Sequence, residues 1–75
     1  MKPIVVESTT LATVAYNADR RLLQLEFRDR AVYQYFEVPA DVHEALLRAQ
    51  SKGGYFNRAI RGRFASAQTL INSLS

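Results

Sequence analysis

The fold is decided by residues 22–36, Leu-Leu-Gln-Leu-Glu-Phe-Arg-Asp-Arg-Ala-Val-Tyr-Gln-Tyr-Phe, in which two apolar runs flank a charged break. In the first run, Leu23, Leu25 and Phe27 recur at every second position, which is the period of a half-buried strand. The second run contains three aromatic residues, and these favour a pleated surface. Because the break is so short, the stretch predicts a tight β-hairpin.

The length of this turn determines which face of the hairpin Tyr33 and Tyr35 occupy. If Asp29 and Arg30 form a two-residue loop, both tyrosines lie on the face opposite Leu23, Leu25 and Phe27. A three-residue loop reverses the parity and places both tyrosines with those leucines. We favour the two-residue loop, although its second position requires positive φ, where glycine is preferred over Arg30.

The flanking sequence supplies another strand and two helices. Residues 11–16 are compatible with a strand, and a polar turn separates them from the hairpin. Pro39 suits the first turn of a helix, and Ser51 is a suitable N-cap for a second helix that runs to about Ile60 before Gly62. The sequence therefore predicts an α+β fold, with a three-stranded antiparallel β-meander followed by two short α-helices packed on one face.

The chain has 75 residues, which is enough for one small domain. We expect an N-terminal arm at residues 1–7, the folded domain at 8–64, and a C-terminal tail or short extra helix at 65–75. The expected core is apolar and draws on every element: Val14, Leu23, Leu25, Phe27, Phe36, Leu46, Phe56 and Ile60.

Composition indicates an ordinary globular protein of a reducing compartment. Hydrophobic residues make up 48% of the chain, and there is no cysteine to form a disulfide. Residues 1–10 contain neither the apolar run of a signal peptide nor that of a membrane span. We therefore expect a cytoplasmic protein without membrane attachment.

The charge is distributed unevenly along the chain. The net charge is +3, yet all seven acids lie between Glu7 and Glu44. Five cations follow without any acid: Arg48, Lys52, Arg58, Arg61 and Arg63. Such clustering favours an acidic partner, and nucleic acid is the commonest one. The alternative is a solvated helix face that keeps a small protein in solution.

Seven short blocks occur in the order that characterises one known family: Val14-Ala-Tyr16, Leu23-Gln-Leu-Glu-Phe27, Tyr33-Gln-Tyr35, Val38-Pro39, Ala49-Gln-Ser-Lys-Gly53, Tyr55-Phe-Asn57 and Ile60-Arg61. Together they resemble the KTSC domain, which is named for its occurrence at the C-terminus of some lysyl-tRNA synthetases and is also found as a stand-alone bacterial protein. The sequence departs from the family at Arg30, where a hairpin glycine is usual. The resemblance implies no specific activity, but its synthetase context suggests RNA binding.

No constellation of residues predicts catalysis or a cofactor. His43 is the only histidine, and neither a metal site nor a catalytic acid, base and nucleophile set is recognisable. The stretch Ser51-Lys52-Gly53-Gly54 lacks the spacing of a phosphate-binding P-loop. We interpret it as a helix cap and close turn, with a phosphate contact as the minority alternative. We therefore expect a non-enzymatic protein that needs no cofactor or metal.

Two functions remain as hypotheses. In the first, the module binds RNA or another nucleic acid: Lys52, Arg58, Arg61 and Arg63 contact phosphates, while Tyr33 and Tyr35 stack on bases. Arg58 and Arg61, three residues apart, are expected to share one helix face. Both tyrosines can alternatively be interpreted as aromatic residues that pack in the core or in a second layer. In the second hypothesis, an exposed sheet face or edge binds a protein or a second copy of the chain.

Overall fold

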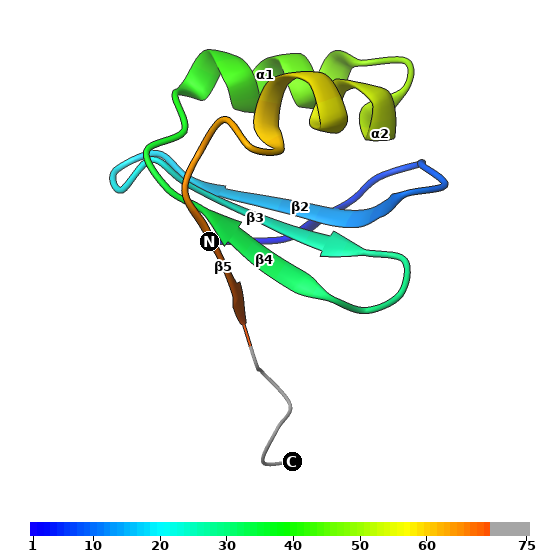
Figure 1. Ribbon diagram of the computed structural model, residues 1–75, viewed down its shortest axis with the longest axis horizontal. Helices are drawn as coiled ribbons and strands as arrows, with labels where there is room; N and C mark the ends of the chain where they lie inside the picture. Colours follow the sequence, from blue (N-terminus) through cyan, green and yellow to red (C-terminus); the bar gives the residue numbers. More distant parts are fainter. Residues whose placement is uncertain (70–75) are drawn as a thin grey trace.

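The computed structural model describes residues 1–69, which form one antiparallel sheet covered on one face by helices (Figure 1). The sheet order is the chain order, with strands β1 (Ile4–Val5), β2 (Leu11–Asn17), β3 (Leu22–Phe27), β4 (Val32–Tyr35) and β5 (Ser66–Thr69). The helical layer consists of α1 (Ala40–Arg48), α2 (Lys52–Tyr55) and the π-helical turn η1 (Phe56–Ile60). The α+β class predicted from the sequence is confirmed.

The predicted number of strands is wrong, because two short strands extend the meander at its edges. At one edge β1 pairs with β2, Ile4 lying opposite Val14, and at the other β5 pairs with β4, Ser66 lying opposite Tyr35. Both added strands are largely exposed, so neither needs the apolar alternation that identifies a half-buried strand. Strand β5 replaces the start of the expected tail or helix. The rest of that expectation, residues 70–75, lies outside the described residues.

The two-residue loop predicted for the central hairpin is also wrong. Phe27 donates its backbone N–H to Ala31 O at 2.9 Å, and Arg30 donates to Phe27 O at 2.9 Å, which closes a three-residue loop. Arg30 has a φ of 76°, as the last position of such a loop requires. Tyr33 and Tyr35 consequently face the helices, in register with the leucines of β3.

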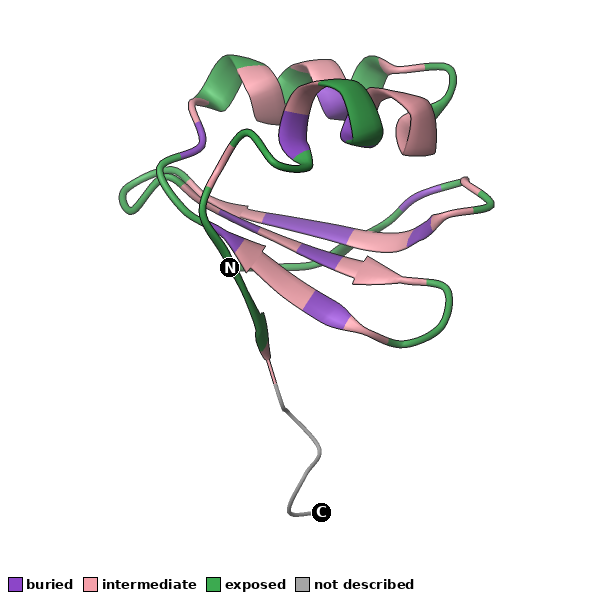
Figure 2. Ribbon diagram, viewed as in Figure 1, coloured by how far each residue is buried: buried purple, intermediate pink, exposed green. Residues whose placement is uncertain are grey.

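Because the parity is reversed, Tyr35 and not Phe36 occupies the core position on β4. Tyr35 is 5% exposed, whereas Phe36, which was expected inside, is 39% exposed. The other predicted core residues are buried, except Phe27, which is partly buried and packs against the core. Figure 2 shows the buried positions on the strands and on the inward side of the helices.

A β-bulge adapts β2 to this core. The pairing of β2 with β3 shifts by one residue between Leu11 and Thr13. Leu11 and Val14 are an odd number of positions apart and would face opposite sides of a regular strand. The bulge restores both to the core side, and both are fully buried.

The second helical segment is held close to the segment before β2. The Ser51 side chain accepts a hydrogen bond from Gly54 N at 3.1 Å, which confirms Ser51 as its N-cap. A Cβ at Gly53 would overlap Thr10 Oγ1, so glycine is required for this close approach. The segment ends with Arg61 N donating to Phe56 O at 2.9 Å, and Gly62 follows at a φ of 75°. Within residues 1–69, no helix has the length and apolar character needed to cross a membrane.

Leu25→Ala is expected to destabilise the domain by about 2–5 kcal/mol, because Leu25 is fully buried at the centre of the sheet. The free energy of unfolding from urea denaturation would measure the loss. An unchanged midpoint would contradict the assignment of this face to the core.

Arg30→Gly is expected to stabilise the domain by about 0.5–1 kcal/mol, because glycine adopts positive φ without a steric penalty. Arg20→Gly is the matched control, since it removes the same side chain from a turn position that is not at positive φ. We expect that control to be neutral or destabilising. Equal effects of the two substitutions in urea denaturation would show that charge, not backbone geometry, is responsible.

Candidate nucleic-acid interface

A groove of about 540 Å³ lies between the β3–β4 hairpin and the η1 turn. Its floor is aromatic, and its rim carries amide, hydroxyl, guanidinium and carboxylate groups. The principal lining residues are Thr10, Phe27, Asp29, Tyr33, Tyr35, Phe56, Asn57, Arg61 and Ser66. We refer to this site as the aromatic groove.

Four rings pack edge to face or at a tilt to form the floor. Phe27 contacts Tyr33 with centroids 5.9 Å apart and Phe56 with centroids 5.3 Å apart, both nearly perpendicular. Tyr35 lies 5.7 Å from Phe56 and 6.4 Å from Tyr33. Such contacts add to area burial and hold each ring in one orientation. The floor is therefore preorganised by the same residues that complete the core.

Tyr35 contributes an edge to the groove, not an exposed ring face. Burial raises the pKa of its hydroxyl above the usual value, and Tyr33 adds to this effect, whereas Arg61 opposes it. The phenol is therefore neutral at physiological pH and is available as a donor. Tyr33 is less buried, so it offers more surface than Tyr35 does.

Arg61 is positioned by the end of the π-helical turn. Its backbone N–H closes that turn on Phe56, and its guanidinium Nη1 lies 3.5 Å from Asn57 Oδ1. The side chain is exposed and keeps several donors available. Asn57 and Arg61 thus form a paired amide and guanidinium on one rim of the aromatic groove.

The opposite side of the groove is fixed by the segment before β2. Thr10 N donates to Ser8 Oγ at 3.0 Å, and Arg28 N donates to Thr10 O at 3.0 Å. Asp29 lies at the hairpin end, where its Oδ1 accepts a hydrogen bond from Ala31 N at 3.0 Å. This carboxylate makes the hairpin end of the groove less favourable for an anion than the Arg61 end.

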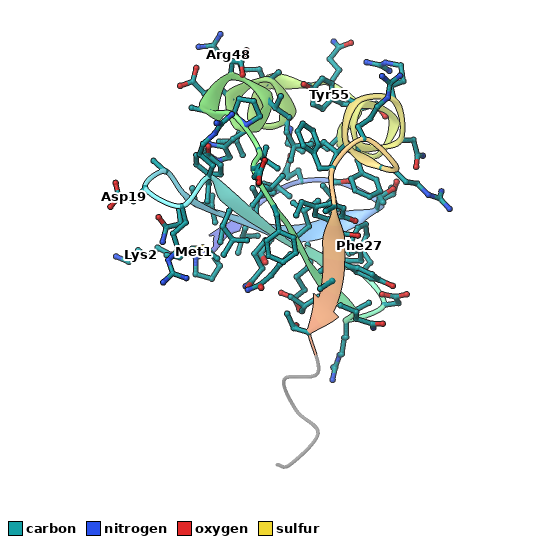
Figure 3. All side chains as sticks on the ribbon, turned by 60° about the vertical axis from the view of Figure 1, so that its left-hand side comes forward. Met1, Lys2, Asp19, Phe27, Arg48 and Tyr55 are labelled. Atoms are coloured by element: carbon teal, nitrogen blue, oxygen red, sulfur yellow. The ribbon has the colours of Figure 1, made fainter. Side chains whose placement is uncertain are left out.

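Arg58 does not share a face with Arg61, contrary to the sequence-based expectation. The two lie in different hollows, because a π-helical turn advances each residue by a smaller angle than an α-helix does. The Arg58 guanidinium lies 5.9 Å from the centroid of the Tyr55 ring, which is a cation–π contact. Arg48 lines the same hollow, of about 530 Å³, and Figure 3 shows Arg48 on α1 and Tyr55 between the two helical segments.

Lys52 and Arg63 lie apart from the aromatic groove. Lys52 donates from Nζ to Ala49 O at 3.0 Å and lines a third hollow, of about 420 Å³, beside residues 7–10. Arg63 is exposed in the turn after η1 and lines none of these three hollows. Of the six residues predicted for binding, the structure gathers Tyr33, Tyr35 and Arg61 in one place.

Several lining residues were not predicted from the sequence. Asn57 belongs to the block Tyr55-Phe-Asn57, which supports the family resemblance, and this block was the one feature of the sequence that could have identified Asn57 as a site residue. Thr10 and Ser66 had no such signal, because their positions depend on tertiary pairing at opposite ends of the chain.

His43 lies outside these hollows and stacks on Tyr16, with ring centroids 4.4 Å apart and planes inclined by 13°. Tyr16 in turn donates its hydroxyl to Val38 O at 2.6 Å. Burial lowers the pKa of His43, and Glu44 partly offsets that effect. Within residues 1–69, no three side chains of His, Cys, Asp or Glu gather in a way that could hold a metal ion.

The structure defines a small α+β domain with a five-stranded sheet, one helical layer and an aromatic groove between them. A family model described as the KTSC domain matches residues 7–64. The chain belongs to the KTSC domain family.

Solved and curated relatives agree with this assignment. The fold matches the crystal structure of a KTSC domain protein from Yersinia pestis with a TM-score of 0.88 and 32% identity, over 91% of this chain and 96% of that one. An uncharacterised protein from Stutzerimonas stutzeri is 36% identical over 81% of this chain and 86% of its own length. A lysine–tRNA ligase from Nostoc punctiforme is 39% identical over 83% of this chain, which spans 11% of that ligase.

Acidification is expected to destabilise the wild-type domain through His43. Its lowered folded-state pKa means that stability is present above the unfolded pKa of about 6.5 and is lost as pH falls through the folded value. His43→Phe keeps an aromatic ring beside Tyr16 and removes this titration. Urea denaturation between about pH 7.5 and pH 5.5 should show a smaller loss in the variant. Equal losses would contradict the effect of burial on His43.

Proposed function

We propose that this KTSC domain is a non-enzymatic RNA-binding module that receives single-stranded RNA at the aromatic groove. The observation that carries the proposal is the combination of partly exposed Tyr33, the Tyr35 hydroxyl and the Asn57–Arg61 pair around one groove. Proteins recognise unpaired bases with aromatic rings and with amide or guanidinium donors at the base edges. The groove supplies all three kinds of group.

The burial of Tyr35 changes the binding mode expected from the sequence. Its ring is 5% exposed and packs against Phe56, so two adjacent bases cannot stack on an open pair of tyrosines. A base that enters the aromatic groove instead meets the exposed part of Tyr33 and the hydroxyl edge of Tyr35. Its neighbouring phosphate then lies within reach of Arg61, which suits bidentate contact with oxyanions.

The distribution of charge supports an anionic ligand. All five cations after Glu44 belong to the helical segments or to the turn that follows them, and Arg61 is the one that lines the groove. Arg48, Arg58, Arg61 and Arg63 are exposed. Electrostatic attraction of this kind accelerates association with nucleic acid and gives affinity without much sequence choice.

The protein context of the relatives supports RNA in particular. A matching segment occurs in lysine–tRNA ligases, which by name act with a transfer RNA. A domain joined to such an enzyme is placed where an accessory contact with RNA is useful. The ligases support RNA as the ligand class of the present chain, for which no ligase activity is inferred.

A protein-binding role is the second candidate, and exposed apolar side chains at the sheet edge favour it. Ile4 is 51% exposed and Val5 is 79% exposed on the short strand β1. The edge of a sheet presents unpaired backbone groups, and exposed apolar side chains beside them favour pairing with another chain. Binding there would bury apolar surface and would respond weakly to salt.

Arg61→Gln is expected to weaken the binding of a single-stranded oligouridylate several-fold at low salt, because a phosphate contact in the groove is lost. It should also reduce the slope of log K against log salt by about 0.7, the share of one phosphate on a single strand. Fluorescence anisotropy across a salt series would measure both changes.

Arg20→Gln is the matched control, since it removes one equally exposed cation from the turn between β2 and β3. It should alter binding much less than Arg61→Gln does. Equal effects would indicate attraction by net charge alone. Absence of RNA binding by the wild-type protein at low salt would overturn the proposal and favour a protein partner.

A further inference from the structure

The aromatic groove and the other two hollows described above lie next to one another and share wall residues. The aromatic groove and the 420 Å³ hollow share Thr10 and Asn57 in their walls. The 420 Å³ hollow and the 530 Å³ hollow share Gln50 and Ser51. We call them the aromatic groove, the middle hollow and the outer hollow. Because neighbouring hollows share wall residues, the three form a series along residues 50–61, from the hairpin to α1, and we call this series the surface path.

Each part of this path contains at least one cation held by a neighbouring group. Arg61 lies beside Asn57 in the aromatic groove. Lys52 lines the middle hollow, and its Nζ donates to the O atom of Ala49, a residue of the outer hollow. Arg58 rests over Tyr55 in the outer hollow, where Arg48 is a second cation. The positive charges are therefore spread along the path and are not gathered at one point.

We infer that the path binds a run of consecutive nucleotides of single-stranded RNA, with one end at Arg61 and the other at Arg58. This inference rests on the proposed function and extends it from a single groove to an elongated site. A single strand carries one negative charge per nucleotide, so its charges match cations that are spaced along linked hollows. A compact anion would require the cations to converge.

The two ends of the path differ in the contacts that they provide. The groove end offers aromatic edges and an amide for a base, whereas the outer end offers the Arg58 guanidinium, held on the Tyr55 ring. A guanidinium plane held in this way can stack on an unpaired base as well as pair with a phosphate. The middle hollow is polar and contains hydroxyl groups from Ser8 and Thr10, which are partners for ribose hydroxyls.

Two acids limit where phosphates can lie along the path. Asp29 lines the hairpin end of the aromatic groove, and Glu7 lines the middle hollow. Phosphates are therefore expected on the helical side of the path, beside Lys52 and Arg61. Gly53 packs without space for a Cβ against Thr10, which lines both the aromatic groove and the middle hollow.

The test is the dependence of affinity on oligonucleotide length in the full chain. Oligouridylates of one, two, four and eight nucleotides would be titrated into the wild-type protein, Arg58→Gln, Arg61→Gln and the double variant, with Arg20→Gln as the control. An NMR spectrum of each variant would confirm that it is folded. We expect affinity to rise at least about tenfold from one nucleotide to eight, beyond the statistical gain from additional registers on the longer strand.

The arginine variants distinguish an elongated site from a local one. With eight nucleotides, Arg58→Gln and Arg61→Gln should each lower the salt slope by about 0.7, and the double variant by about twice that amount. With one nucleotide, at most one of the two substitutions should change the affinity or its salt slope. Octanucleotide binding that is insensitive to Arg58→Gln, or that gains nothing with length, would overturn the elongated site and leave RNA binding at the groove intact. If no oligonucleotide bound at low salt, the proposed function would fail as well.

Discussion

The register of the β3–β4 hairpin is the constraint on which the rest of the structure depends. With Leu25 opposite Tyr33 and Leu23 opposite Tyr35, the aromatic side chains of β4 face the helical layer. A shift by one residue would send both rings to the uncovered face and bring Phe36 inward. The present register buries Tyr35 against Phe56 and so joins the sheet to η1. The aromatic floor of the groove is a direct consequence of this hairpin register.

A second constraint acts at the helical layer and determines which cations lie on the helical side of the groove. The close approach of Gly53 to Thr10 sets the helix against the segment before β2, while the π-helical turn directs Arg61 toward the hairpin. An α-helical continuation would have kept Arg58 and Arg61 on nearly the same face. The π-helical turn separates them, so the same sequence supplies cations to two hollows. π-helical insertions are frequent at functional sites.

Residues with strong local signals were predictable from the sequence, and those that depend on tertiary pairing were not. The alternation of Leu23, Leu25 and Phe27 and the N-cap at Ser51 were recognisable because each follows a local rule. The loop length was not, because Arg30 is the last loop residue and has positive φ in both the two-residue and the three-residue loop, so the residue type there does not distinguish them. Strand β5 was missed because an exposed edge strand requires only backbone pairing and has no distinctive side-chain pattern. The candidate site was predicted in part, since its cations were visible in the charge pattern but their separation by the π-helical turn was not.

The aromatic groove lies almost entirely within the part of the chain that the KTSC family model matches. Apart from Ser66, its lining residues lie within the span matched by the KTSC family model. Most of this chain matches an uncharacterised protein over most of that protein's length and a lysine–tRNA ligase over a small part of that ligase. Strand β5 lies beyond the matched span and contributes only Ser66 to the groove. The chemistry to compare among relatives is accordingly that of the Asn57–Arg61 rim and the tyrosine floor, since these groups determine what the groove can hold.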